Sequence, residues 1–110
     1  GLLESIYQKC FAIELLERGI AFRQEVEIPI LYKGNWVQGQ LKCDFFVENL
    51  LVVELKAVSE NLPIHHAQVI NYMNLLQIPK GVLLNFNSLL RQSNTLYEVF
   101  SPSGVVQLTL

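Results

Sequence analysis

The feature that most constrains this chain is the stretch from Cys43 to Lys56, in which two apolar segments flank a Glu-Asn pair. This pattern predicts two strands joined by a tight turn. Because strand side chains alternate between faces, Glu54 and Lys56 are expected on the same face of the sheet. If the turn pairs the strands in register, Asp44 comes close to Glu54. Two carboxylates on an otherwise apolar face need a partner, and a divalent cation is the partner that best suits their oxygen atoms.

The composition bounds the class of protein. The chain has 110 residues, of which 51% are hydrophobic and 16% are charged, as expected for one domain with one core. No run approaches the ~20 apolar residues of a membrane span, and no signal peptide is visible. Cys10 and Cys43 both lie in apolar runs, which predicts buried free thiols and a reducing compartment. We therefore expect a cytoplasmic protein that does not enter a membrane.

The formal net charge of the chain is −2, with eight Lys and Arg residues in total. This balance argues against a broad electrostatic grip on nucleic acid, whose backbone attracts basic surfaces. A local basic rim around an acidic metal site is still compatible with it. The mean hydropathy of +0.31 indicates an apolar excess, which suggests a homo-oligomeric interface.

The spacing of apolar residues predicts two helices and six strands. The helices are expected over residues 2–18 and 63–77. The strands are expected over residues 22–32, 36–47, 50–56, 80–86, 96–100 and 105–110, the last two as a hairpin. Gly19 suits the position that ends the first helix, and Pro29 favours an edge strand or a bulge.

The order of these elements predicts a mixed sheet of the α/β class. A strand, a crossover helix and a strand in one sheet imply parallel pairing with a right-handed connection. We expect an αβββαβ core, with helices on both faces of a four-stranded sheet and a C-terminal β-hairpin outside that core. The apolar run from Leu50 to Val53 marks the third strand as central. The chain is expected to be a single domain over 1–110, with its core over about 1–88 and the hairpin over about 95–110.

The pattern Asp44…Glu54-x-Lys56 resembles the motif of the PD-(D/E)XK nuclease superfamily. Residues 1–7, Gly-Leu-Leu-Glu-Ser-Ile-Tyr, resemble the motif that names the GxxExxY family, a branch of that superfamily. Two later segments resemble further blocks of this branch in the same order, namely His65 to Tyr72 and Gly81 to Phe86. The resemblance covers about residues 1–90. It implies a restriction-endonuclease-like fold, metal-dependent hydrolysis of DNA or RNA, and a further helical segment before the first residue.

The resemblance also assigns roles to individual residues. It implies that Asp44 and Glu54 bind Mg²⁺ or Mn²⁺, with the Leu55 carbonyl as a third ligand and Glu4 as a further candidate ligand. Lys56 would orient the attacking hydroxide and offset negative charge in the transition state. The catalytic residues that it implies are Glu4, Asp44, Glu54, Lys56, Gln68 and Tyr72.

Each of the charged residues also has a plainer interpretation. Asp44 can bind a backbone amide beside the turn, Glu54 can form an ordinary ion pair with a neighbouring lysine, and Lys56 can end in solvent. Glu4 can be a charge in the first helical turn that offsets the helix dipole. Tyr7, three residues later on the same helix face, is expected to pack with its hydroxyl at the edge of the site.

His65, Gln68 and Tyr72 share one face of the second helix, because they are three and four residues apart. In the family that the chain resembles, this block faces the acidic cluster, so Gln68 would hold Lys56 or a phosphate oxygen. The alternative is a polar helix face turned to water. His66 lies about 100° further round the helix and is expected to be exposed to solvent.

Other chemistries lack the residues that they need. The sequence has no Gly-rich phosphate loop, no Gly-x-Ser-x-Gly elbow and no paired Cys-x-x-Cys. Two functions stay open. The first is a Mg²⁺- or Mn²⁺-dependent nuclease with DNA or RNA as its partner, favoured by the ordered motifs. The second is a catalytically silent nuclease-fold module that binds nucleic acid or protein, favoured by the acidic balance and the small size.

Overall fold

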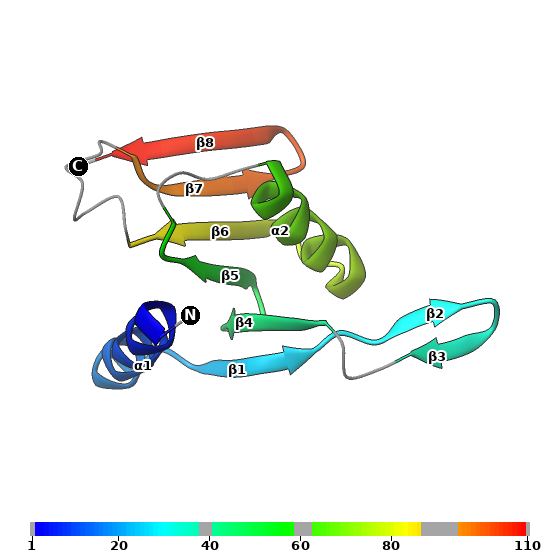
Figure 1. Cartoon of the computed structure of the whole chain (residues 1–110), viewed down its shortest axis with the longest axis horizontal. Helices are drawn as coiled ribbons and strands as arrows, with labels where there is room; N and C mark the ends of the chain where they lie inside the picture. Colours follow the sequence, from blue (N-terminus) through cyan, green and yellow to red (C-terminus); the bar gives the residue numbers. More distant parts are fainter. Residues whose placement is uncertain (1, 38–40, 59–62, 87–94, 110) are drawn as a thin grey trace.

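The computed structural model describes residues 2–37, 41–58, 63–86 and 95–109 (Figure 1). In chain order the elements are α1 (Leu2–Glu17), β1 (Phe22–Glu27), β2 (Ile30–Tyr32), β3 (Asn35–Val37), β4 (Lys42–Val47), β5 (Leu51–Lys56), α2 (Pro63–Leu76), β6 (Lys80–Asn85), β7 (Thr95–Ser101) and β8 (Gly104–Thr109). Both helices and the last four strands of the main sheet agree with the sequence expectation to within one residue.

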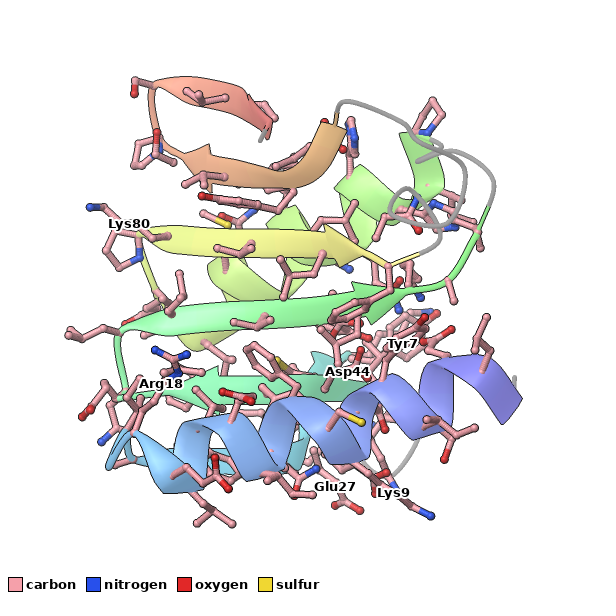
Figure 2. All side chains as sticks on the ribbon, turned by 90° about the vertical axis from the view of Figure 1, so that its left-hand side faces the viewer. Tyr7, Lys9, Arg18, Glu27, Asp44 and Lys80 are labelled. Carbon is pink, nitrogen blue, oxygen red and sulfur yellow. The ribbon has the colours of Figure 1, made fainter. Side chains whose placement is uncertain are left out.

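Six strands form one sheet in the order β1-β4-β5-β6-β7-β8. β5 and β6 are parallel, as their crossover through α2 requires, and the other neighbours are antiparallel. Figure 1 and Figure 2 show α1 and α2 on opposite faces of this sheet. The predicted αβββαβ core with a mixed sheet is therefore confirmed. The C-terminal hairpin, expected outside that core, continues the same sheet because β7 pairs with β6, so the sheet has six strands and not four.

The expectation of two long strands over residues 22–32 and 36–47 is wrong, because each of them is split. β1 ends just before Ile28, whose N–H makes a last bond to the Leu41 carbonyl at 2.9 Å. Pro29 has no N–H with which to continue the ladder. β2 and β3 instead form a separate two-stranded ribbon that projects from the edge of the main sheet (Figure 1).

An apolar core lies on each face of the main sheet. The core under α1 contains Ala12, Leu15, Phe45, Val47, Val53 and Leu55. The core under α2 contains Ile28, Cys43, Phe46, Val52, Val69, Tyr72, Met73, Leu83 and Phe100. β5 contributes to both, which confirms it as a central strand. The packing of α2 on β6 is close, because a Cβ added at Gly81 would lie 2.6 Å from Val69 Cγ1.

The two cysteines differ in burial. Cys43 is buried, as expected, but Cys10 is exposed on α1, so the expectation of two buried thiols is wrong for Cys10. Only one face of α1 packs on the sheet, and Cys10 lies outside that face. Within the described ranges, no helix is both long enough and apolar enough to cross a membrane.

Both helices end in the same motif. Gly19 has a φ of 68°, and the N–H of Ile20 donates to the carbonyl five residues back at 2.9 Å. Gln77 has a φ of 58°, and Ile78 makes the equivalent bond at 2.8 Å. These are Schellman motifs, in which the residue after the left-handed position packs back on the core. Ile20 and Ile78 do so, and they thereby direct the chain into β1 and β6.

The turn between β4 and β5 sets the register of the candidate site. Glu48 and Asn49 have φ values of 54° and 55°, which define a two-residue turn of type I′. Flanking backbone groups close it with a 2.9 Å hydrogen bond. Leu50 adds a third residue to the loop, because the observed register pairs Val47 with Leu51, and the continuation of this register places Asp44 opposite Glu54.

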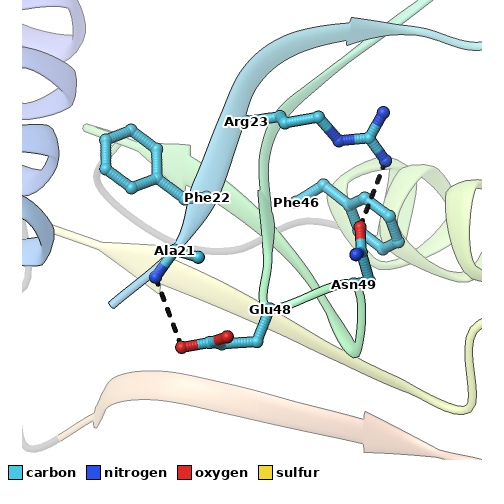
Figure 3. A pocket seen from close by; sticks show the side chains of 6 residues that line it. All are labelled: Ala21, Phe22, Arg23, Phe46, Glu48 and Asn49. Atoms are coloured by element: carbon cyan, nitrogen blue, oxygen red, sulfur yellow. Dashed lines mark hydrogen bonds between the residues drawn. The ribbon is translucent and has the colours of Figure 1, made fainter. Parts of the chain in front are cut away.

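A pocket of about 190 Å³ lies beside this turn (Figure 3). The Arg23 guanidinium lies 5.0 Å from the centroid of the Phe46 ring and donates to Asn49 Oδ1 at 3.4 Å. The Ala21 N–H donates to Glu48 Oε1 at 3.3 Å. These contacts tie the turn to the edge strand β1, so the pocket belongs to the scaffold that holds β4 and β5 in register.

Candidate active site

β4 and β5 part at the point where the two predicted carboxylates lie. Their backbone ladder ends at the pair of Phe45 and Val53. Beyond that pair, the Asp44 N–H donates to Glu54 Oε1 at 2.9 Å, and the Leu55 N–H donates to Asp44 Oδ2 at 2.8 Å. Carboxylate oxygens thus replace backbone carbonyls as acceptors for these two N–H groups. The structure therefore brings Asp44 and Glu54 together across the two strands.

The carboxyl of Glu54 lies in an environment that disfavours its charge. Glu54 is 2% exposed, and its burial, followed by the charge of Asp44, raises its pKa from 4.5 to about 9. Burial, followed by the charge of Glu54, also raises the pKa of the Cys43 thiol to about 12. Among the residues that the structure describes, no ion pair joins Glu54 to Lys56 or Lys42. The charge of Lys56 nevertheless acts on Glu54, because it lowers the pKa of this carboxyl against the effects of burial and of Asp44.

Lys56 follows Glu54 on the same face of β5, since two residues separate them. It lines an open pocket of about 690 Å³, within the size range of small-molecule sites. The other residues that line this pocket are Ile64, His65, Ala67, Gln68 and Asn71. The pocket thus has the end of β5 on one side and a polar face of α2 on the other.

α2 places Gln68 and Tyr72 over the carboxylates. Tyr72 is 2% exposed, and Gln68 Nε2 donates to its hydroxyl at 3.2 Å. Burial raises the pKa of Tyr72, the bond from Gln68 opposes this, and the charges of Glu54 and Asp44 add to the rise. Tyr72 is therefore buried beside the carboxylates, whereas Gln68 and His65 are partly exposed and line the open pocket. Gln68 and Lys56 line the same pocket, Gln68 from α2 and Lys56 from β5.

α1 reaches the same end of the sheet. The Tyr7 ring stacks on that of Phe86, with centroids 4.4 Å apart and an angle of 5° between the planes, in agreement with the expected packing role. Figure 2 shows Tyr7 and Asp44 toward one end of the strands, whereas Arg18 and Lys80 lie toward the other end.

Glu4 and His65 belong to the same electrostatic neighbourhood. Burial lowers the pKa of His65, the positive charges of Lys56 and His66 lower it further, and Glu4 raises it. In the described part of the chain, however, no three His, Cys, Asp or Glu side chains converge closely enough to hold a metal ion. Direct coordination of a metal by Glu4 therefore stays a prediction.

The expectation that His66 is exposed to solvent is wrong. Its Nε2 lies 2.9 Å from Glu98 Oε1, and its ring meets that of Phe100 edge-on with centroids 5.3 Å apart. Glu98 lies on β7 and is 1% exposed. The argument from helical angles failed because β7 extends the sheet beneath this side of α2. The one signal in the sequence was an acidic residue inside an otherwise uncharged strand.

Asn85 is a buried polar residue to which sequence reasoning assigned no mechanism. It lies at the end of β6, is 3% exposed and is in register with Lys56. Its Oδ1 accepts a hydrogen bond from the Val58 N–H at 3.2 Å. Asn85 therefore fixes the segment that follows Lys56. The sequence feature that could have indicated this role is the amide residue at the end of an otherwise apolar strand.

The donor set at Asp44 and Glu54 fits a hard dication. The Leu55 N–H points toward β4, and the N–H and C=O of one strand residue point to the same neighbouring strand, so the Leu55 carbonyl is directed there as well. A pKa of about 9 keeps a proton on Glu54 near neutral pH, and a cation that replaces this proton would relieve the repulsion with Asp44. Mg²⁺ needs only one or two carboxylates when waters and phosphate complete its shell.

A twisted mixed sheet between two helices, with a carboxylate pair and a lysine where two strands part, defines a nuclease-type α/β domain. The model of the PD-(D/E)XK nuclease superfamily matches residues 1–96, and the chain belongs to that superfamily. Membership of the GxxExxY branch stays a prediction.

The crystal structure of SSO0001 shares the fold with a TM-score of 0.58 and 22% sequence identity. The match covers 97% of this chain and 50% of that one, so this chain spans half the length of SSO0001. At this identity the similarity concerns the fold alone. No curated protein matches the chain.

Proposed function

We propose that this chain is a metal-dependent nuclease that hydrolyses phosphodiester bonds of DNA or RNA. The observation that carries the proposal is the reciprocal contact of Asp44 and Glu54 where β4 and β5 part, with Lys56 on the same face. Membership of the PD-(D/E)XK nuclease superfamily supports it. The open pocket that Lys56 and α2 line is large enough to accept a nucleotide.

Asp44, Glu54 and the Leu55 carbonyl would hold Mg²⁺ or Mn²⁺. Such a dication supplies Lewis acidity, which activates water as a nucleophile and neutralises charge on the phosphoryl group. Glu54 must release its proton to act as a ligand. Because its pKa is raised to about 9, the metal affinity should increase as the pH rises toward that value.

Lys56 and Gln68 act on the phosphate from opposite walls of the pocket. The ammonium group of Lys56 stabilises negative charge that develops in the transition state and orients the nucleophile. Gln68 is held by its bond to Tyr72, so its side chain is fixed where it can meet a phosphate oxygen. Tyr72 is a positioning residue that acts through Gln68.

Incubation of the purified protein with single- and double-stranded DNA and RNA, in Mn²⁺, in Mg²⁺ and in EDTA, tests the proposal. We expect cleavage that needs the dication and falls by at least about 100-fold in Asp44→Asn, Glu54→Gln and Lys56→Met. Lys80→Met is the matched control, because Lys80 is exposed at the other end of the sheet and should leave the rate unchanged. Activity that survives Glu54→Gln belongs to a contaminant and rejects the mechanism.

Isothermal titration with Mn²⁺ separates this proposal from a nuclease-fold module without turnover. We expect heat from the wild-type protein and its loss in Asp44→Asn. If Mn²⁺ produces no heat, and nucleic-acid binding survives Asp44→Asn, the silent module is supported instead.

The homo-oligomer suggested by the mean hydropathy stays a prediction, and a monodisperse monomer in light scattering would contradict it.

A further inference from the structure

The ribbon of β2 and β3, residues 30–37, is here termed the arm. It forms a sheet of its own, in which Tyr32 pairs with Asn35, and a tight turn at Lys33 and Gly34 closes it. A two-stranded hairpin without a core is at best marginally stable in water. A partner that covers the arm would therefore stabilise it.

The arm exposes two large aromatic side chains. Trp36 is 65% exposed and Tyr32 is 61% exposed. The register places them on opposite faces of the ribbon, because Trp36 follows directly after the residue that pairs with Tyr32. Lys33 Nζ lies 5.5 Å from the centroid of the Tyr32 ring, so a cation accompanies the aromatic surface at the tip. Aromatic rings with an adjacent cation are the groups that hold unpaired bases and their phosphates.

The charge of this segment differs from that of the rest of the chain. The arm contains Lys33 and no acidic residue, whereas the whole chain has ten acidic residues and a net charge of −2. A polyanion is therefore attracted to this segment although the protein as a whole repels it. A second copy of this chain carries a net charge of only −2, far below the charge density of a nucleic-acid strand, so its attraction to this segment is much weaker.

The arm and the candidate active site are joined by a short stretch of chain. Asp44 lies eight positions after Trp36 in the sequence, which is at most about 29 Å of extended chain. Figure 1 shows the arm on the same side of the sheet as α2, and this is the face that carries Glu54 beneath Tyr72. A strand of twelve nucleotides spans this distance even at about 3.4 Å per nucleotide.

From these observations we propose that the arm is a stacking platform for single-stranded nucleic acid. An unpaired base stacks on Trp36, and the strand passes round the tip of the arm so that a backbone phosphate pairs with Lys33, which lies beside Tyr32 on the other face. The inference rests on the proposed nuclease function and deepens it, because it names a single strand as the substrate class. Stacking on an aromatic ring tolerates any base, so the arm contributes affinity without sequence preference.

Trp36 is the single tryptophan of the chain, so its fluorescence reports on the arm alone. The test titrates the Glu54→Gln protein in EDTA with a twelve-nucleotide oligothymidylate and with a twelve-base-pair duplex. We expect saturable quenching by the single strand and markedly less by the duplex. In fluorescence anisotropy with a labelled oligothymidylate, Trp36→Ala should weaken binding by roughly 5- to 100-fold, and Trp36→Phe should retain most of the affinity.

Leu16→Ala is the matched control, because Leu16 is 68% exposed on α1, away from the arm, and should leave both signals unchanged. Equal quenching by the duplex, wild-type affinity in Trp36→Ala, or no binding at all would each overturn the proposal. So would light scattering that shows a dimer dissolved by Trp36→Ala. The two proposals can fail separately. If the single strand quenches Trp36 but the protein fails to cleave nucleic acid with any metal, only the proposed nuclease function is overturned. If the protein cleaves nucleic acid but Trp36→Ala binds it with unchanged affinity, only the proposed role of the arm is overturned.

Discussion

Asp44 and Glu54 each accept a hydrogen bond from the backbone of the opposite strand, at 2.8 Å from the Leu55 N–H and at 2.9 Å from the Asp44 N–H respectively. The two carboxylates thereby end the ladder of β4 and β5 and lie beside each other in a buried setting. Burial of Glu54, followed by the charge of Asp44, raises the pKa of Glu54 to about 9, although the hydrogen bond from the Asp44 N–H opposes this rise, so that Glu54 keeps a proton in the absence of a cation.

The first prediction concerns the pH dependence of stability without metal. The pKa of Glu54 is about 9 in the folded protein against 4.5 ordinarily, so the folded state holds a proton that the unfolded chain releases. The stability that this proton contributes is complete below pH 4.5 and is lost as the pH rises to about 9, at up to about 1.4 kcal/mol per pH unit. Urea denaturation in EDTA measures the free energy of unfolding at each pH. Between pH 4.5 and about 9, this free energy should change less with pH in Glu54→Gln than in the wild-type protein. Identical profiles would contradict the raised pKa.

The second prediction concerns His66 and Glu98. His66→Ala removes the contact at 2.9 Å and should lower the free energy of unfolding by about 1–3 kcal/mol. A double-mutant cycle with Glu98→Gln should give a coupling of about 1 kcal/mol. Ile64→Ala on the same helix is the control, since Ile64 is 70% exposed and should change stability by less than about 0.5 kcal/mol. Additive effects in the cycle would show that the two residues do not interact in solution.

The third prediction concerns the segment after β5. Asn85→Ala removes the acceptor of the Val58 N–H and should lower the free energy of unfolding by about 1–3 kcal/mol, because a partly buried donor loses its partner. Asn74→Ala on the exposed side of α2 is the matched control and should stay within about 0.5 kcal/mol. Chemical denaturation measures both. A small effect of Asn85→Ala would mean that Val58 finds another acceptor.

The fourth prediction concerns the ends of the helices. Gln77 has a left-handed backbone, which costs a residue with a side chain about 1–2 kcal/mol, so Gln77→Gly should stabilise the protein by up to about 1 kcal/mol. Gly19 occupies the equivalent left-handed position after α1, so Gly19→Ala introduces a side chain there and should destabilise the protein by about as much. Each change should shift Tm by roughly 4–8 °C in opposite directions. Shifts of the same sign would contradict the assignment.

Much of the candidate site could be predicted from local rules. Only nine residues lie between Asp44 and Glu54, and the short loop at residues 48–50 leaves one register in which the apolar side chains meet the cores. Alternation along β5 then places Lys56 on the face of Glu54. Helical spacing likewise predicts that Gln68 and Tyr72 share a face.

The course of residues 28–41 could not be predicted from the same rules. Alternation of apolar residues continues through Pro29, and it does not reveal whether a neighbouring strand is present to pair with. The burial of Ile28 beneath α2 and the missing N–H of Pro29 together end the ladder, and the first of these depends on an element more than thirty residues later.

The sequence by itself determined both helices, the strands from β5 onward and the pairing of Asp44 with Glu54, because each of these depends mainly on neighbours close along the chain. Only the tertiary structure decided that Glu98 meets His66, that Asn85 holds Val58 and that Glu54 retains its proton near neutral pH. Burial and long-range contacts are properties of the packed sheet and helices, and no short segment of sequence contains them.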